Sequence, residues 1–162
     1  MKKIAIFICL VTFVFVGVSC SKVNTVDVEI SKLANVNWHL IKMELVVNNP
    51  VSTAYNADTT MYPLDCDSDN YTKFLPDSSF IQYNGIIKCI SGEPDSMVGK
   101  WSYNKTNSSL LLDSGLQNEQ LYKIAELDFL NMVLVQDYSI EKHIENSVVT
   151  IRTRKTYYYQ NE

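Results

Sequence analysis

The feature that most constrains this chain is a series of short apolar runs that follow one another closely from residue 38 to the end. In most of them apolar and polar residues alternate, which is the period of a β-strand with one buried face. The breaks between the runs are rich in Asn, Asp, Ser, Gly and Pro, residues that favour turns. We expect strands at 38–47, 71–75, 79–83, 86–90, 99–103, 109–113, 120–126, 132–136 and 147–159, a helical turn at 31–36, and a polar loop at 48–63.

This spacing leaves little room for crossover helices, and no strand–helix–strand rhythm occurs after residue 38. Many short strands joined by local turns are typical of an antiparallel barrel or sandwich. The first and last runs are the long ones, so their pairing would close a meander and remove both sheet edges. The sequence therefore predicts an all-β fold, a small antiparallel meander β-barrel of about eight strands.

The first run changes phase within itself. Trp38 and Leu40 have one parity, whereas Ile41, Met43 and the apolar residues up to Val47 have the other. A single extra residue in a strand moves all later side chains to the opposite face. We therefore expect a β-bulge near residues 40–41 that brings both apolar sets inward.

The first twenty residues have the layout of a bacterial lipoprotein signal. Two lysines precede an apolar run from Ile4 to Val18, which at about 15 residues is short for a membrane span of ~20. Ser19 and Cys20 then follow. This end resembles a lipobox, in which the cysteine thiol accepts a diacylglycerol and becomes the new N-terminus after cleavage. It departs from the usual pattern at Gly17, where Leu or Val is common.

The resemblance implies a protein held in a membrane through acyl chains on Cys20. No Asp follows the cysteine closely, since Ser21 and Lys22 stand there, which by analogy favours the outer membrane of the cell envelope. Two alternatives stay open: a secretory signal in which Cys20 is incidental, and an uncleaved anchor helix. We divide the chain into a signal peptide (1–19), a lipidated cysteine with a tether (20–32), and a barrel domain (33–162).

Charge excludes one class of partner. The signal contains two lysines and no acidic residue, so its removal changes the net charge from −4 to −6. The remaining charges are scattered and form no basic stripe, so we expect no binding of nucleic acid.

Cysteine usage indicates a covalent cross-link. Cys9 lies in the signal and Cys20 is the lipid site, which leaves Cys66 and Cys89 in the exported part. In an oxidising compartment a disulfide is the expected state, and a closed loop of about 24 residues would contribute roughly 3 kcal/mol. Two free thiols or a metal site are the alternatives. A metal site would need two more ligands nearby, and neither His39 nor His143 is close to these cysteines in sequence.

The order of these landmarks resembles the small lipocalin-like domains of Bacteroidetes lipoproteins. The shared order is a tryptophan-bearing first strand (Trp38), a cysteine in an acidic turn (Cys66), a second cysteine (Cys89), a Gly-x-Trp strand (Gly99–Trp101), and closing strands. The resemblance covers about residues 33–158. It implies a small β-barrel and transfers a fold more than an activity.

Candidates for metal binding and catalysis are weak. Asp65, Asp67, Asp69 and Asn70 suggest a calcium loop, but a glycine is missing at the sixth position, so a polar turn is the simpler interpretation. No nucleophile motif accompanies the histidines, and the acid pair around Pro94 is typical of a turn. We expect no metal, no cofactor and no enzymatic activity.

Aromatic residues are the remaining candidates. An eight-stranded barrel either fills its interior or holds one small ligand, and an aromatic lining suits an apolar molecule or a sugar face. Plain core packing is the alternative. We predict binding of a small apolar ligand or an envelope component; the rival is a protein–protein or hydrolase-inhibitor module with a filled barrel and an exposed aromatic patch. The candidate lining residues are Trp38, Phe74, Phe80, Trp101 and Tyr122.

Overall fold

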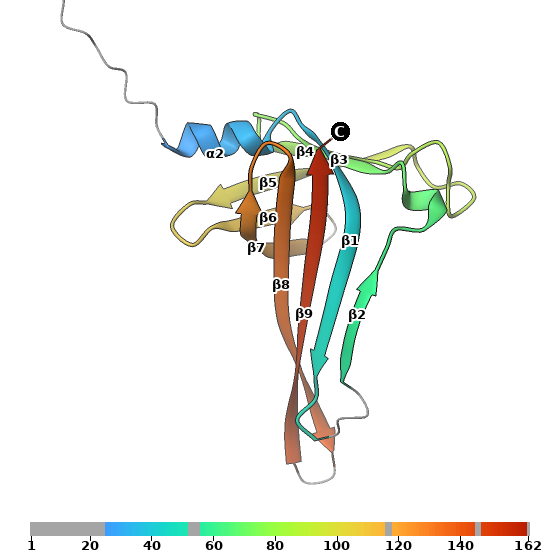
Figure 1. Cartoon of the computed structure of the whole chain (residues 1–162), viewed down its shortest axis with the longest axis vertical. Coiled ribbons are helices and arrows are strands. Elements are labelled where there is room, and N and C mark those ends of the chain that lie inside the picture. Colours follow the sequence, from blue (N-terminus) through green and yellow to red (C-terminus); the bar gives the residue numbers. More distant parts are fainter. Residues whose placement is uncertain (1–24, 52–55, 116–117, 145–146, 162) are drawn as a thin grey trace, which may run out of the picture.

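A computed structural model describes residues 25–51, 56–115, 118–144 and 147–161; the signal segment and Cys20 lie outside these ranges. A helix, α2 (Thr25–Leu33), precedes the strands, and a short 3₁₀ turn spans Asp65–Asp67. The strands in Figure 1 are β1 (Asn37–Asn48), β2 (Ala57–Met61), β3 (Tyr71–Phe74), β4 (Ser79–Tyr83), β5 (Ser96–Asn104), β6 (Ser109–Asp113), β7 (Glu119–Leu127), β8 (Asn131–Ile144) and β9 (Ser147–Asn161).

The sheet closes on itself. Strands β3 to β9 follow one another in sequence order as antiparallel neighbours, and β1 pairs with both β3 and β9. These eight strands form a closed barrel, while β2 is an additional strand on β1. The predicted all-β meander barrel, closed by its first and last strands, is confirmed.

The predicted β-bulge is present in β1. Leu40 lies opposite Tyr159 and Lys42 opposite Tyr158, so Ile41 is the extra residue. The bulge allows Trp38, Leu40 and Met43 to share one face of the strand, and Ile41 itself is exposed. The change of phase in the sequence therefore has the physical cause that we expected.

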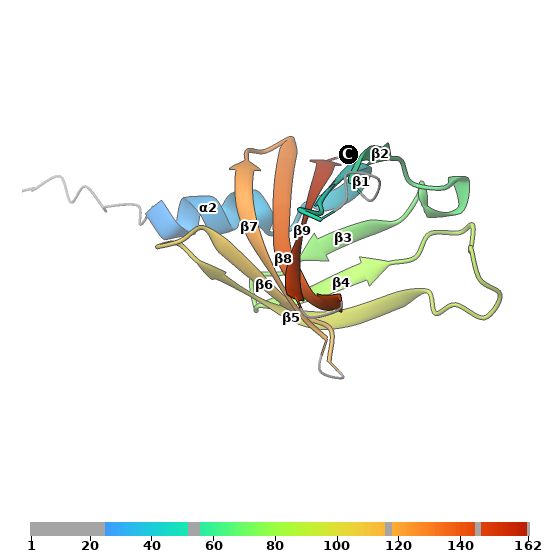
Figure 2. The same cartoon turned by 90° about the horizontal axis from the view of Figure 1, so that it is seen from below.

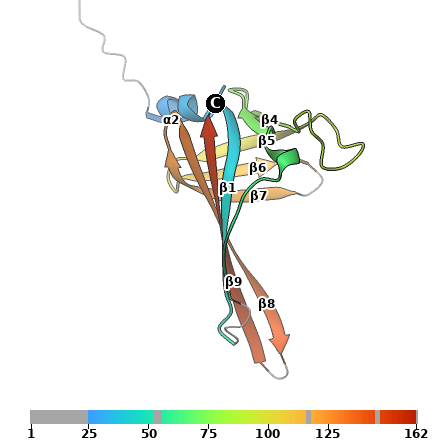
Figure 3. The same ribbon diagram turned by 45° about the vertical axis from the view of Figure 1, so that its right-hand side comes forward.

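Strands β8 and β9 are longer than the barrel requires. They pair over their whole length, from Asn131–Gln160 to Ile144–Ser147, and with β1 and β2 they extend beyond the barrel as a twisted ribbon (Figures 1 and 3). The sequence predicted a strand only at 132–136. Side chains from 137 to 143 are exposed, so the apolar alternation that marks a half-buried strand is weak there.

Two further expectations from the sequence are wrong. Residues 57–61, expected in a loop, form β2, which pairs with β1 through Met43–Met61. Its side chains are mostly exposed, so they give little hydrophobic pattern. Residues 86–90, expected as a strand, form bends instead, and Ile86 is 94% exposed. That stretch belongs to a loop that is cross-linked through Cys89.

Helix α2 lies where the sequence suggested a tether, and Figure 2 shows it beside β7. Leu33, at its last turn, is 1% exposed, and Ile30 packs against the core. The hydroxyl of Tyr103 donates to Glu29 at 2.9 Å. The division at residue 32 stays a prediction, although the helix runs across it.

The core fills the end of the barrel next to α2. Its buried members are Leu33, Trp38, Phe74, Phe80, Trp101, Leu110, Tyr122, Met132 and Leu134. The packing accounts for the glycine of the Gly-x-Trp motif, Gly99, which lies opposite Phe80. A Cβ atom at this position would stand 2.4 Å from the phenyl ring of Phe80 and 2.5 Å from the Asp113 carbonyl oxygen. The glycine therefore gives the Phe80 ring its space, and Trp101, two residues on, enters the same core.

Candidate functional site

A cavity of about 320 Å³ occupies the end of the barrel away from this core. Strands β3, β4, β5, β6, β7 and β9 contribute one or two side chains each, and the β6–β7 connection contributes two more. The lining residues are Thr72, Phe80, Gln82, Met97, Leu112, Ser114, Asn118, Gln120, Tyr122, Tyr157 and Tyr159.

The register of the sheet shows that this cavity is the continuation of the barrel interior. Phe74 lies opposite Phe80 in the core, and two residues along the same strands Thr72 lies opposite Gln82. Side chains two apart on a strand share a face, so Gln82 points inward above Phe80. In the same way Gln120 lies two residues before Tyr122 on β7 and shares its inward face. Phe80 and Tyr122 are both buried core residues and form the floor.

Three tyrosines dominate the aromatic part of the lining. The rings of Tyr122 and Tyr157 meet edge to face, with centroids 5.7 Å apart. Burial, and secondly the neighbouring Tyr157, raises the pKa of Tyr122 to about 12. Burial also raises the pKa of Tyr157 and of Tyr159 above the ordinary value. All three phenols are therefore neutral near pH 7, and the Tyr122 hydroxyl donates to Oε1 of Gln120.

The three tyrosines at 157–159 in β9 alternate between the two faces of the sheet. Tyr158 lies on the outer face, where its hydroxyl donates to Glu44 at 2.7 Å and its ring lies 4.0 Å from Nζ of Lys42. Tyr157 and Tyr159 line the cavity on the inner face. The Tyr158 contacts hold β9 against β1 and so help to fix the two inner rings.

A side pocket of about 200 Å³ adjoins the cavity and shares Thr72, Gln82 and Tyr159 with it. It exists because β1 and β3 pair through only two residue pairs, Asn37–Lys73 and Trp38–Thr72, before they diverge. The segment 63–70 covers the resulting gap and supplies side chains to it. The other lining residues are Trp38, Leu40, Pro63, Asp67, Asn70 and Tyr71.

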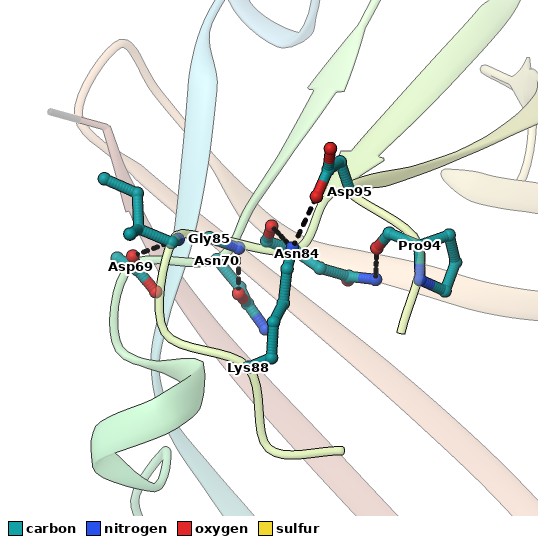
Figure 4. A network of polar contacts seen from close by, with 8 residues as sticks. Asp69, Asn70, Asn84, Gly85, Lys88, Pro94 and Asp95 are labelled. Carbon is teal, nitrogen blue, oxygen red and sulfur yellow. Dashed lines mark hydrogen bonds and ion pairs between the residues drawn. The ribbon is translucent and has the colours of Figure 1, made fainter. Parts of the chain in front are cut away.

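The predicted disulfide joins this covering segment to the β4–β5 loop. Cys66 and Cys89 are bonded, with their Cα atoms 5.1 Å apart. Two backbone amides of the loop are bound by the acidic turn: Gly85 N–H donates to Oδ1 of Asn70, and Ile86 N–H donates to Oδ2 of Asp69, both at 2.6 Å (Figure 4). The disulfide therefore stands beside two hydrogen bonds that join the same two segments.

The β4–β5 loop is also held internally. The side-chain amide of Asn84 donates to the Pro94 carbonyl at 2.8 Å, and its backbone N–H donates to the Asp95 carbonyl at 2.9 Å. Lys88 donates to the Asn84 carbonyl and forms an ion pair with Asp95 at 3.3 Å (Figure 4). These contacts tie both ends of the loop together next to the side pocket.

In the acidic turn at 65–70, Asn70 and Asp69 accept hydrogen bonds from the backbone amides of Gly85 and Ile86. This role favours the polar-turn interpretation over a calcium loop. Asp67 accepts from the side-chain amide of Asn70 at 2.9 Å. Among the described residues, one group of three potential metal ligands comes together: Cys66, Asp67 and Cys89. Its two sulfurs are bonded to each other, so they provide no thiolate ligand.

The five aromatic residues expected to line a cavity divide into two groups. Phe80 and Tyr122 line the barrel cavity, and Trp38 lines the side pocket. Phe74 and Trp101 pack edge to face in the core, with their ring centroids 5.6 Å apart. Nε1 of Trp101 also donates a hydrogen bond to the Leu75 carbonyl oxygen, with 3.0 Å between the two atoms. One end of the interior is thus filled and the other is open.

Sequence reasoning missed most of the polar lining, above all Gln82, Gln120, Tyr157 and Tyr159. A signal was present. Gln82 and Gln120 have the same strand parity as Phe80 and Tyr122, so they fall on the inward face of any strand that buries those aromatics. A glutamine on an inward position indicates an interior that is open to water or ligand.

Exposed aliphatic residues mark the cross-linked loop. Ile86, Ile87 and Ile90 are all more than half exposed, as are Tyr62 and Leu64 on the segment joined to it. This group is mainly aliphatic, whereas the alternative hypothesis of a protein-binding module predicted an exposed aromatic patch.

Comparisons with protein-family models, with curated proteins and with solved structures found no match. Within the described ranges, no helix has both the length and the hydrophobicity needed to cross a membrane.

Proposed function

We propose that this chain is a lipid-anchored protein of the outer membrane that holds a small ligand, without chemical conversion, in the open end of a lipocalin-like barrel. The observation that carries the proposal is the contrast between the two ends of the interior. Nine buried residues fill the end next to α2, whereas aromatic and amide side chains surround a cavity at the other end. Small-ligand sites are typically such concave pockets, with an aromatic lining and a few polar groups.

The anchoring half of the proposal rests on the sequence, in which the lipobox-like end places Cys20 directly before the exported part. From there to the start of α2 there are few residues, so the barrel would stand close to the acyl chains. Two or more acyl chains are needed for stable membrane attachment.

Native mass spectrometry of protein purified from its source membranes tests the binding half. We expect a bound small molecule that is lost in Met97→Trp, because Met97 lines the cavity and the larger indole would fill it. Val98→Trp is the matched control, since Val98 is the next residue of β5 and is 61% exposed on the outer face. Absence of a bound molecule from the unmodified protein, or its retention in Met97→Trp, would count against the proposal.

A second candidate function is docking of a protein through the cross-linked loop, which the exposed Ile86, Ile87 and Ile90 favour. Single exposed apolar residues are common, but three within five positions of a braced loop are typical of a contact surface. In this case Ile86→Ser/Ile90→Ser would abolish capture of the partner and Met97→Trp would not. The opposite pattern would favour the cavity.

A further inference from the structure

We infer that the barrel cavity selects an uncharged ligand rich in hydroxyl groups, of the sugar class, over an apolar chain or an ion. The inference rests on the proposed function, because it assumes that the cavity binds a small molecule, and it names which chemistry the lining accepts.

The first argument is charge. The described lining of the cavity contains aromatic, aliphatic, hydroxyl and amide side chains but no ionised group. A carboxylate or phosphate entering it would lose water without gaining a cation, which is costly. The adjoining side pocket contains Asp67, whose carboxylate would repel an anion further. Fatty acids and acidic or phosphorylated sugars are therefore disfavoured.

The second argument is hydrogen bonding. The Gln82 amide has no hydrogen-bond partner among the described residues, and the Gln120 side chain accepts from Tyr122 but keeps both N–H donors free. Asn118, Ser114 and Thr72 add further donors and acceptors around the cavity. An amide supplies both donors and acceptors, which matches hydroxyl groups because each hydroxyl also does both. An alkyl chain would leave these groups unpaired, which lowers affinity.

The third argument is the distribution of the aromatic rings. Tyr122 and Tyr157 meet edge to face at the floor, and Tyr159 lies on the wall shared with the side pocket. A sugar ring has C–H faces that pack on aromatic rings and a rim of hydroxyls that needs polar partners. The hydroxyls of these tyrosines are neutral near pH 7, as ordinary phenols are, and burial raises their pKa values further, so they do not repel an uncharged ligand. The Tyr122 hydroxyl already donates to Gln120, so toward a ligand it acts as an acceptor.

The fourth argument is size. A volume of about 320 Å³ is at the lower end for ligand pockets, and the side pocket of about 200 Å³ adjoins it. This volume suits one or two sugar rings and is too small for a long acyl chain.

Saturation-transfer NMR and calorimetry on the exported domain, with its disulfide intact, test the inference. The probes are glucose, galactose, mannose, N-acetylglucosamine and their common disaccharides, with glucuronic acid and glucose 6-phosphate as charged counterparts and dodecanol and lauric acid as apolar ones. We expect binding of at least one neutral sugar. Its charged counterpart should bind at least about tenfold more weakly, because the charge would lose water without gaining a cation in the cavity.

Variants connect binding to the cavity. Gln82→Leu and Gln120→Leu remove the amides with little change of volume, so each should weaken sugar binding about tenfold or more. Gln160→Leu, on the exposed outer side of β9, is the matched control and should leave binding unchanged.

The possible failures are distinguishable. Binding of dodecanol or lauric acid that Met97→Trp removes, without sugar binding, would overturn the sugar inference and leave the proposed function in place. Binding of no probe also overturns the inference, and the proposed function is then decided by the bound molecule in native mass spectrometry. Sugar binding that the two leucine variants do not weaken would exclude this cavity as its site.

Discussion

The indole N–H of Trp38 donates a hydrogen bond to the carbonyl oxygen of Leu33, with 3.0 Å between nitrogen and oxygen. Leu33 ends α2 and Trp38 is the second residue of β1, so one side chain joins the helix to the barrel. Both residues are almost completely buried. The last carbonyls of a helix have no partner within it, and Trp38 supplies one from inside the core.

Trp38→Phe should therefore lower the free energy of unfolding by about 2 kcal/mol, because it leaves a buried carbonyl unpaired and removes part of a large side chain. It should also loosen α2, which hydrogen exchange of the helix amides would detect. Trp101→Phe is the matched control: it loses an equivalent bond to the Leu75 carbonyl, far from the helix in sequence. Equal exchange of α2 in both variants would argue against the role given to Trp38.

Gly99→Ala should destabilise the barrel by about 1–3 kcal/mol, the usual cost of overpacking. The added methyl group would stand 2.4 Å from the Phe80 ring and 2.5 Å from a backbone oxygen of β6. Phe80→Leu in the same chain should recover part of this loss, since the two sites are in contact and their effects are not additive. Chemical denaturation of the single and double variants measures the coupling; strictly additive losses would contradict the packing argument.

Stability should fall at alkaline pH because of Tyr122. Its pKa is raised to about 12 in the folded protein, against about 10 in an unfolded chain. The contribution of this group is complete below pH 10, and it is lost as the pH rises from about 10 to 12, since only the unfolded state ionises readily there. Denaturation at several pH values, with tyrosinate absorbance as a second readout, should show a smaller loss in Tyr122→Phe. An identical pH profile in that variant would refute this assignment.

The strands that were predicted well are those with one buried face. β3, β4 and β6 alternate between core and outer positions, and the phase change in β1 predicted its bulge at Ile41. The ribbon part of β8 and the whole of β2 escaped because their pairing is set by a partner strand, with few side chains buried. Local hydrophobicity does not encode that partner.

The site was predicted only in part for a related reason. The aromatic residues that form its floor have a strong apolar signal, and Phe80 and Tyr122 were expected. The polar wall depends on which strands meet at the open end, and Gln82 and Gln120 become neighbours of Tyr159 only after closure of β1 on β9. A cavity is a property of the assembled barrel, so no single strand indicates it.

Loss of the disulfide should lower the free energy of unfolding by about 3 kcal/mol. The bond joins Cys66 and Cys89, which are 23 positions apart in sequence, and so it restricts the unfolded chain. Cys66→Ala/Cys89→Ala should show this loss, and reductant should have the same effect on the unmodified protein but none on the variant. Denaturation curves with and without reductant provide the comparison. Equal stability of the unmodified protein under both conditions would mean that the cross-link contributes nothing measurable.

Cys20→Ala should release the protein from the membrane fraction, because acylation of this thiol is the proposed means of attachment. Each buried methylene of an acyl chain contributes about 0.8 kcal/mol, so the loss of two or three chains removes the anchor entirely. Cys9→Ala is the matched control, since Cys9 lies within the apolar run of the signal and has no expected acceptor role. Fractionation of cells followed by immunoblotting measures the outcome. Retention of Cys20→Ala in the membrane fraction would instead favour an uncleaved anchor helix formed by the run from Ile4 to Val18.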